Sequence, residues 1–484
     1  MSTEHENEAK SFLTVGGVAI SMAFFLFRPS VCILEEYTPL YLKQIGYSPS
    51  FIGLAPVLGL VTQTVGIPLL GYLADKFRAR KLFLFFSVLL SIPSALLFLA
   101  ADTPEPICDG NTGNLTVDNT SLVNVLFNST YTGLNESQLT SPSKTQNEKD
   151  GNRLRFFFIF MVLRGIFELL KRLTVTLITV AAMTHLQQDK TKFGYYASWG
   201  EIGGGLALFI VGMSLYRFQH NVCGSLAPDY VVIFFFVVGF QVLTLVTLPF
   251  MKFQYLEHRV IDYEEVKKVL TDPHYILILV ICCHSGLCSA FQTRWEFWYI
   301  EKLGGGSIVM AVAGLLRRPI VAVWFLLSRV IIKRVGELKV IGFSLLIFAL
   351  SFLALAFIEN AWLVILFDNF QAASYVLSFA SFVVHFSNTS SDASAAFFQG
   401  AVSLTFHGIG KEAGTAITGY LFTTVGTKIT LCCYSLLTVV LLVFFSIFFF
   451  CTRNPKGYTN FQESEEERGE VIELSPLNET SSLH

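Results

Sequence analysis

The sequence predicts an all-α membrane protein with twelve transmembrane helices in two six-helix halves, and three observations support this. Hydrophobic residues make up 53% of the chain and charged residues only 14%, which leaves too little polar surface for a water-soluble fold. Apolar runs near the length of roughly 20 residues that a helix needs to cross a bilayer follow one another along the chain. Charges inside these runs recur with a period of three helices, an internal repeat typical of transporters.

The apolar runs set the expected spans. We expect them at residues 12–34, 51–74, 82–101, 155–184, 194–215, 229–251, 274–298, 308–329, 338–358, 362–385, 395–421 and 428–451. They form an N-terminal half, 12–251, and a C-terminal half, 274–451, which are joined by a linker, 252–273. Residues 1–11 and the acidic tail, 452–484, are polar. Because the number of spans is even, both termini lie on the same side of the membrane.

Basic residues in the short loops orient the chain. The loops on the side of the termini carry Lys76, Arg78, Arg80, Lys81, Lys190, Lys192, Lys252, Arg259, Arg329, Lys333 and Arg334. The opposite short loops offer little beyond Lys43, Arg217, Lys302 and Lys428. Because cytoplasmic loops are enriched in Lys and Arg, both termini are expected in the cytoplasm. Residues 458–461 of the tail fit a tyrosine-based sorting signal, so we expect the plasma membrane or an endosomal membrane.

The long loop 102–152 is then external, and two features of the sequence agree with this. It contains four acceptor sites for N-glycosylation, at Asn114, Asn119, Asn128 and Asn135. Glycans are added only to loops that face the lumen or the outside. Of the nine cysteines, only Cys108 and Cys223 lie in external loops. A disulfide between them is a hypothesis that this oxidising environment allows.

Charge inside the predicted spans follows a pattern. In each group of three helices, the first and second carry charge and the interior of the third carries none. The first helices carry Arg28, Arg164, Glu168, Lys171, Arg172, Arg294, Glu296 and Asp368, and the second carry Glu201, Arg317, Arg318, Lys411 and Glu412. A charge at mid-bilayer costs a few kcal/mol or more unless it faces water or a partner. Helices 1, 4, 7 and 10 are therefore expected to line a polar cavity, with 3, 6, 9 and 12 facing lipid.

The densest cluster lies on helix 4. Arg164, Glu168 and Lys171 recur at spacings of four and three, so they share one face of the helix. One interpretation is an ion-pair ladder that lets the helix tolerate buried polarity. The other is a site for an anionic or strongly polar solute, or a protonatable Glu168 whose pKa is set by its basic neighbours. Further candidates for carrying a proton are Glu201, Asp368 and His407.

Two other patterns in the sequence concern the external end of helix 7 and the close packing of helices. Residues 292–299 mix charge with aromatic side chains near the external end of helix 7, which fits interfacial anchoring, an outer gate or a platform on which a sugar-like solute stacks. Helices 5 and 11 carry small residues at near-helical spacing, where backbones can approach closely. These are Gly200, Gly203, Gly204, Gly205, Gly408, Gly410, Gly414 and Gly419.

Several function classes have no support in the sequence. Zinc-ligand spacing, a nucleophile motif and a basic surface suited to nucleic acid are all missing from it. The glycine clusters lie within membrane spans and follow no strand, so they do not form a phosphate-binding loop. We therefore expect no enzyme activity, no cofactor, no metal and no nucleic-acid partner.

One charged joint carries a family resemblance. Residues 71–81 resemble the loop between helices 2 and 3 of major facilitator superfamily transporters, with Arg78 where a second glycine is usual. Within the superfamily, residues 37–49, 197–200 and 407–414 are similar to the branch that contains major facilitator superfamily domain-containing protein 6. The lactose permease and nucleoside proton symporters are more distant members. The resemblance implies the major facilitator fold and a cytoplasmic gate formed by Gly71, Asp75, Lys76, Arg80 and Lys81.

Together these observations predict a secondary-active transporter of a small polar or anionic solute that works by alternating access. Proton coupling is an open alternative to facilitated transport. Substrate is expected near the midplane, in contact with Arg28, Glu168, Lys171, Arg294 and Asp368. The alternative function is a non-transporting cell-surface receptor or regulator that binds an extracellular protein through the loop between helices 3 and 4.

Overall fold

The computed structural model describes residues 15–100, 144–186, 193–222, 225–251, 271–389 and 395–451, together with Phe253 and Lys267. Several predictions fall outside this part of the chain: the four glycosylation sites, the Cys108–Cys223 disulfide, the N-terminal segment, most of the linker and the tail. The described residues up to Val439 pack as one unit, and the end of the last helix, from Val440, belongs to a second.

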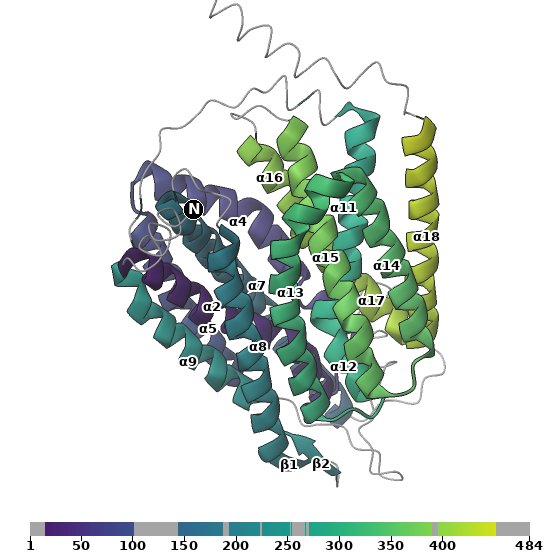
Figure 1. The fold of residues 1–484 in the computed structure, drawn as a ribbon. Helices are drawn as coiled ribbons and strands as arrows, with labels where there is room; N and C mark the ends of the chain where they lie inside the picture. The colour runs from purple at the N-terminus through teal and green to yellow at the C-terminus, as the bar shows by residue number, and fades with distance from the viewer. Residues whose placement is uncertain are drawn as a thin grey trace, which may run out of the picture. The chain divides into compact units, whose positions relative to one another are not determined.

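The N-terminal half consists of helices and one small hairpin (Figure 1). Its helices are α2 (Val15–Gln44), α3 (Pro49–Leu54), α4 (Val57–Lys76), α5 (Arg80–Ala100), α7 (Lys144–Leu186), α8 (Phe193–Arg217) and α9 (Val232–Thr247), which the 3-10 turn η2 (Leu248–Phe250) extends. Strands β1 (Gln219–Val222) and β2 (Ser225–Pro228) pair antiparallel, with Gln219 opposite Pro228. They connect α8 to α9.

The C-terminal half is helical throughout its described residues, but two of its membrane segments are interrupted. Its elements are α11 (Pro273–Ala290), η3 (Phe291–Trp295), α12 (Glu296–Lys302), α13 (Ser307–Val335), α14 (Glu337–Phe357), α15 (Ala361–Thr389), α16 (Ala395–Ser403), η4 (Leu404–Gly410), α17 (Lys411–Thr424) and α18 (Thr427–Cys451). Both η3 and η4 are π-helical. Such segments are rare and occur mostly at functional sites.

The helices confirm the all-α membrane fold class. In the described part of the chain, ten helices are long and apolar enough to cross a membrane. The predicted fourth and eleventh spans fall on α7, which carries several charges, and on the interrupted series α16, η4 and α17. The count of twelve stays a prediction.

The first predicted span ends too early. We expected it to end at residue 34, but α2 continues to Gln44 and holds Glu35 and Glu36 on buried positions inside the helix. Residues 37–42 after the two acids are buried as well, and Tyr37 and Tyr41 belong to the main hydrophobic core. At 1.5 Å per residue, the 30 residues of α2 extend about 45 Å.

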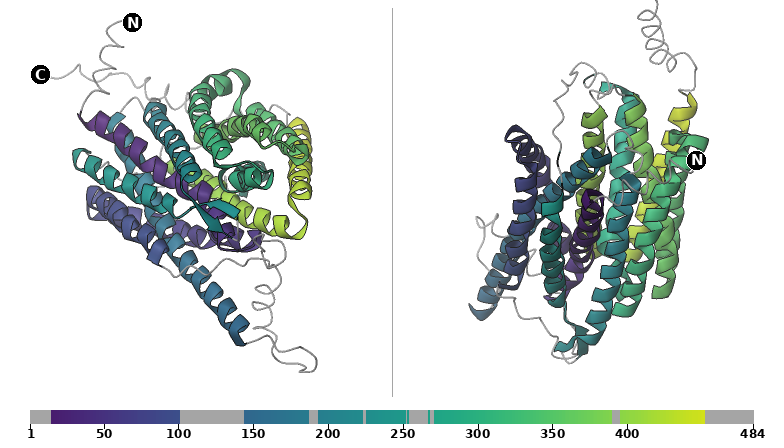
Figure 2. Two further views of the ribbon diagram at one scale, coloured as in Figure 1. Left: turned by 90° about the horizontal axis from the view of Figure 1, so that it is seen from below. Right: turned by 60° about the vertical axis from the view of Figure 1, so that its left-hand side comes forward.

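The two largest contacts between the halves each involve one pair of helices. Helix α8 packs against α13, and α3 packs against α17. Figure 2 shows the helices before residue 251 grouped apart from those after residue 273, with α8 beside α13. Gly419 of α17 is needed at the second contact, because a Cβ atom there would lie 2.3 Å from the carbonyl oxygen of Pro49. The glycines predicted to allow close approach thus include one at the contact between halves.

Candidate substrate site

A cavity of about 360 Å³ lies between the two halves. Its walls come from α2, α7, α11 with η3, α13, α15, and the series α16, η4 and α17; among the described residues, α5, α9, α14 and α18 contribute none. It is lined by Arg28, Val31, Glu35, Lys171, Arg172, Val175, Thr179, Ser289, Gln292, Thr293, Arg317, Arg318, Val321, Tyr375, Phe379, Ser403, His407 and Lys411. The helices that the charge pattern assigns to the cavity therefore line it.

Glu35 is the centre of a first network of buried charges, here called the Glu35 network. Lys171 Nζ lies 3.0 Å from Oε1 of Glu35, and Lys411 Nζ lies 3.0 Å from its Oε2. Lys171 also pairs with Glu168. Because Lys411 belongs to the C-terminal half and the other three to the N-terminal half, the network joins the halves.

Arg294 extends this network from the C-terminal half. Its Nη2 lies 3.6 Å from Oε1 of Glu168 and 3.3 Å from Oε1 of Glu412. Arg164 Nη2 lies 2.7 Å from the same oxygen of Glu168. The ladder predicted on helix 4 is therefore present, but it also pairs with side chains of the other half.

Glu36 is the centre of a second network, here called the Glu36 network. Both Arg317 and Arg318 of α13 pair with Glu36 across the contact between halves. Arg318 Nη1 also lies 3.3 Å from Oε2 of Glu201, which in turn lies 2.7 Å from Arg28. Every pair in this chain of contacts except Arg28–Glu201 joins the two halves.

Arg317 holds two further carboxylates. Its Nη1 pairs with Glu296 and lies 3.5 Å from Oδ1 of Asp368. Gln292 Nε2 donates a hydrogen bond of 2.6 Å to the same Asp368 oxygen. Glu296 and Asp368 are each 2% exposed, and because both face one nitrogen of Arg317, the two carboxyl groups are neighbours.

The two networks carry opposite surplus charges when every group is ionised. The Glu35 network has four basic residues, Arg164, Lys171, Arg294 and Lys411, against three acidic ones, Glu35, Glu168 and Glu412. The Glu36 network has three basic residues, Arg28, Arg317 and Arg318, against four acidic ones, Glu36, Glu201, Glu296 and Asp368. One network is positive by one charge and the other negative by one.

Arg172 stands apart from both networks. It is half-buried and lines the cavity, and it makes no ion pair among the residues that the structure describes. His407 lines the same cavity, with its ring centre 4.8 Å from that of Phe379. An unpaired guanidinium beside Lys411 gives this part of the cavity an excess of positive charge, which attracts anions.

Glu35 and Glu36 were missed by the sequence reasoning. The span boundary at residue 34 placed them in a loop, although the apolar run resumes at once after them. The length of that run could have revealed them, because residues 37–42 continue it without a turn residue other than Pro39.

The aromatic segment of helix 7 is not an interfacial anchor, so that interpretation is wrong. Trp295 is fully buried and donates a hydrogen bond of 3.1 Å from Nε1 to the carbonyl of Thr415. Phe297 packs on Tyr37 of the other half, with ring centres 5.0 Å apart. Nearby, Lys43 Nζ lies 2.7 Å from Glu301. This end of the molecule is closed by contacts between halves, and its role as an outer gate stays a prediction.

The loop between α4 and α5 contains the residues predicted to form the other gate. Arg80 Nε lies 2.5 Å from Oδ1 of Asp75, and Lys81 Nζ donates a hydrogen bond of 2.6 Å to the carbonyl of Pro249. Lys76 Nζ lies 5.8 Å from the ring centre of Tyr72, and a Cβ atom on Gly71 would meet nothing within 4 Å. Arg78 has φ of 47°, in the left-handed region of backbone conformation that favours glycine.

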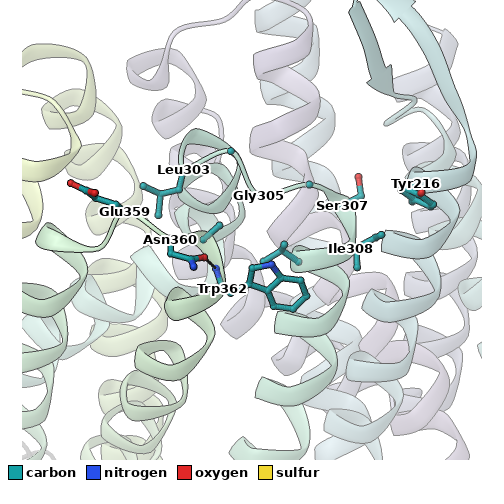
Figure 3. A pocket seen from close by; sticks show the side chains of 12 residues that line it. Tyr216, Leu303, Gly305, Ser307, Ile308, Glu359, Asn360 and Trp362 are labelled. Atoms are coloured by element: carbon teal, nitrogen blue, oxygen red, sulfur yellow. Dashed lines mark hydrogen bonds between the residues drawn. The ribbon is translucent and has the colours of Figure 1, made fainter.

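A larger hollow of about 650 Å³ lies elsewhere, between the loops before α13 and before α15 (Figure 3). Tyr216, the three glycines 304–306, Asn360 and Trp362 line it, with Glu359 as its only charged residue. Because the buried charges are all absent from its lining, the smaller cavity is the candidate substrate site.

Two helical halves that share a polar cavity at their contact define a secondary transporter. Residues 18–452 match the model of the MFS_1 like family, and the chain belongs to this family. It is therefore a multi-pass membrane protein and a secondary-active transporter of the major facilitator superfamily. Membership of a transporter family favours a carrier over a receptor.

Solved transporter structures share the fold. The nucleoside transporter NupG is 14% identical, with a TM-score of 0.64 over 89% of this chain and 98% of that one. A D-xylose-proton symporter is 13% identical, with a TM-score of 0.59 over 88% and 96%. An inward-open conformation of the xylose transporter XylE from E. coli is 14% identical, with a TM-score of 0.57 over 88% and 94%.

Proposed function

We propose that the chain carries a small, strongly polar or anionic solute across the membrane by alternating access, and that it couples this movement to protons. The observation that carries the proposal is Arg172, an unpaired cation in a cavity that both halves line. Burying such a charge without a partner is costly, and an anionic group of the solute would supply that partner.

The Glu35 network links solute binding to movement of the halves. An anion beside Arg172 competes with Glu35 for Lys411, which also lines the cavity. Weakening the Lys411–Glu35 contact removes one bond between the halves. The solute thereby changes the relative stability of the closed and open arrangements, which a ligand can do only through differential contacts.

The Glu36 network supplies the proton site. Glu296 and Asp368 are buried neighbours on one nitrogen of Arg317, and their network has one carboxylate more than it has guanidinium groups. Two adjacent carboxylates in a dry site do not both ionise readily. We propose this pair as the site of proton coupling, and we expect its surroundings to change when the halves separate and water reaches Arg317.

The proposal also includes the orientation of the chain in the membrane and the branch of the superfamily to which it belongs. With both termini in the cytoplasm, the end closed by Lys43 and Glu301 faces outward, and the loop 71–81 forms the cytoplasmic gate. Asp75 and Arg80, paired within that loop, support this role. Residues 37–49 and 407–414 support membership of the branch that contains major facilitator superfamily domain-containing protein 6. The proton symporter among the structural likenesses is consistent with proton coupling.

Uptake of labelled metabolites into proteoliposomes, with and without a pH gradient, tests the proposal. Wild type is expected to move at least one polar or anionic metabolite, and Glu168→Gln to move it at least about tenfold more slowly. The variant leaves Arg164, Lys171 and Arg294 without their shared carboxylate.

Glu359→Gln is the matched control, because this exposed glutamate lies outside the cavity. It should transport at the wild-type rate. If no metabolite enters faster with wild type than with Glu168→Gln under either condition, the proposed function is wrong.

A further inference from the structure

A second, mostly apolar hollow adjoins the substrate cavity. It measures about 170 Å³ and shares Arg28, Val175, Thr179 and Tyr375 with the larger cavity, so the two spaces lie side by side. The remaining side chains and backbone that line it come from Phe24, Phe27, Ile178, Ala197, Gly200, Glu201 and Phe325. Apart from one ion pair and the hydroxyl groups of Thr179 and Tyr375, this wall is aromatic and aliphatic.

That ion pair does not attract a charged ligand. Arg28 Nη2 lies 2.7 Å from Oε1 of Glu201, and Glu201 also accepts from Arg318 at 3.3 Å. The charges of both residues are therefore paired within the protein, although Arg28 Nε has no hydrogen-bond partner among the described residues. The apolar hollow is close to neutral, whereas the adjoining cavity holds the unpaired Arg172.

The charged part of the cavity and the apolar hollow lie a short distance apart along α7. Arg172 lines the charged part, Val175 and Thr179 line the junction, and Ile178 lines the apolar hollow alone. Seven residues of helix rise about 10 Å, so a ligand that touches both parts has its charge and its apolar body within this length.

From this juxtaposition we propose that the cargo is an amphipathic monoanion: one carboxylate or similar head group at Arg172, and an apolar or aromatic body in the hollow beside Phe27 and Phe325. The inference rests on the proposed transport function and names its substrate class. A small hydrophilic anion leaves the aromatic wall in contact with water, and a neutral apolar molecule leaves Arg172 unpaired. An amphipathic anion supplies a partner for Arg172 and also covers the aromatic wall.

Thermal stabilisation of the purified full-length chain in lipid nanodiscs tests the inference. The probes are acetate, phenylacetate, 2-phenylethanol and the hydrophilic anion citrate. Phenylacetate should give half-maximal stabilisation at a concentration at least about tenfold below that of acetate, because its ring is buried. 2-Phenylethanol and citrate should stabilise no better than acetate.

Two variants assign the parts of the site. Arg172→Gln should remove the preference for phenylacetate over 2-phenylethanol. Ala197→Phe, which fills the hollow, should make phenylacetate no better than acetate while leaving the response to acetate unchanged. The melting temperature of each variant without ligand shows whether it is folded.

Three outcomes would overturn the inference: equal binding of acetate and phenylacetate, tighter binding of citrate, or no stabilisation by any probe. If a hydrophilic metabolite is nevertheless transported in a Glu168-dependent way, the proposed function stands and only the substrate class is wrong. If nothing is transported either, both fail.

Discussion

Glu35 and Glu36 are neighbours in the chain, yet they serve different networks. Successive helical residues project about 100° apart, so one acid meets Lys171 and Lys411 while the next meets Arg317 and Arg318. Four basic side chains, three of them from the C-terminal half, thus converge on two adjacent residues of α2. Burial of the two acids is tolerated because each has more than one cationic partner.

Glu35→Gln is expected to lower the melting temperature markedly, because two buried lysines lose the carboxylate that they share. Removing one member of a buried ion pair typically costs about 3–5 kcal/mol. Thermal unfolding of the purified protein measures the change.

Glu301→Gln is the matched control for this prediction. It removes the partner of Lys43, which lies 2.7 Å away, but the side chain of Glu301 is 32% exposed. Such pairs contribute about 0–1 kcal/mol, so the melting temperature should change little. Equal shifts for the two variants would contradict a central role for Glu35.

The sequence identifies the charged residues of the site better than it identifies their partners. Arg164, Glu168 and Lys171 stand out because charge within an apolar run is visible, and their helical spacing predicts their mutual contact. The partners Lys171 and Lys411 of Glu35 lie 136 and 376 residues away in the chain. Such pairs depend on how the helices pack, which periodicity alone does not determine.

At the scale of elements, the apolar runs predict the helices but not their interruptions. Both π-helical segments, η3 and η4, contain residues of the cavity wall, Gln292 in one and His407 in the other. A π-turn shifts the register of all side chains that follow it, so it changes which residues face the cavity. This explains why residues 292–299 were assigned in part to the lipid interface although Trp295 is buried.

Gly419→Ala is expected to prevent α17 from packing on α3. The new Cβ atom would lie 2.3 Å from the carbonyl oxygen of Pro49. That oxygen belongs to the backbone and not to a flexible side chain, so it does not move aside easily. The closed end of the molecule should then open more often. Modification of a cysteine placed at Thr423, which bonds Ser50 across this contact, should become severalfold faster with a maleimide in detergent.

The control for this substitution is Gly239→Ala in α9, where a Cβ atom meets nothing within 4 Å. It should leave the modification rate unchanged. Equal rates in the Gly419→Ala and parent proteins would show that α17 can shift without opening the contact.

At the scale of the whole transporter, the contacts between halves are unevenly distributed. Buried ion pairs join the halves at the cavity, and Lys43–Glu301 and Ser50–Thr423 join them at the end beyond it. The sequence predicts the two halves from the repeat of charge, but it does not predict which end is closed. Both arrangements use the same helices and differ only in how the halves meet, so a single sequence encodes both.

Alternating access requires the contact between α3 and α17 to break and re-form in every cycle, which leads to the last prediction. Ser50 Oγ and Thr423 Oγ1 lie 2.9 Å apart across the halves. Cysteines at both positions should therefore form a disulfide on mild oxidation, since the side chains already approach closely enough. The bond would hold this end closed and stop transport of any substrate.

Uptake by proteoliposomes of the double variant, oxidised and then reduced, measures the effect. Oxidation should abolish uptake and reduction should restore it, whereas each single variant should be insensitive to both treatments. Mobility on a non-reducing gel after cleavage of the chain between the halves confirms that the bond has formed. Normal uptake by fully cross-linked protein would show that the α3–α17 contact stays closed throughout the cycle. The proposal that the two halves rock about the cavity would then be wrong.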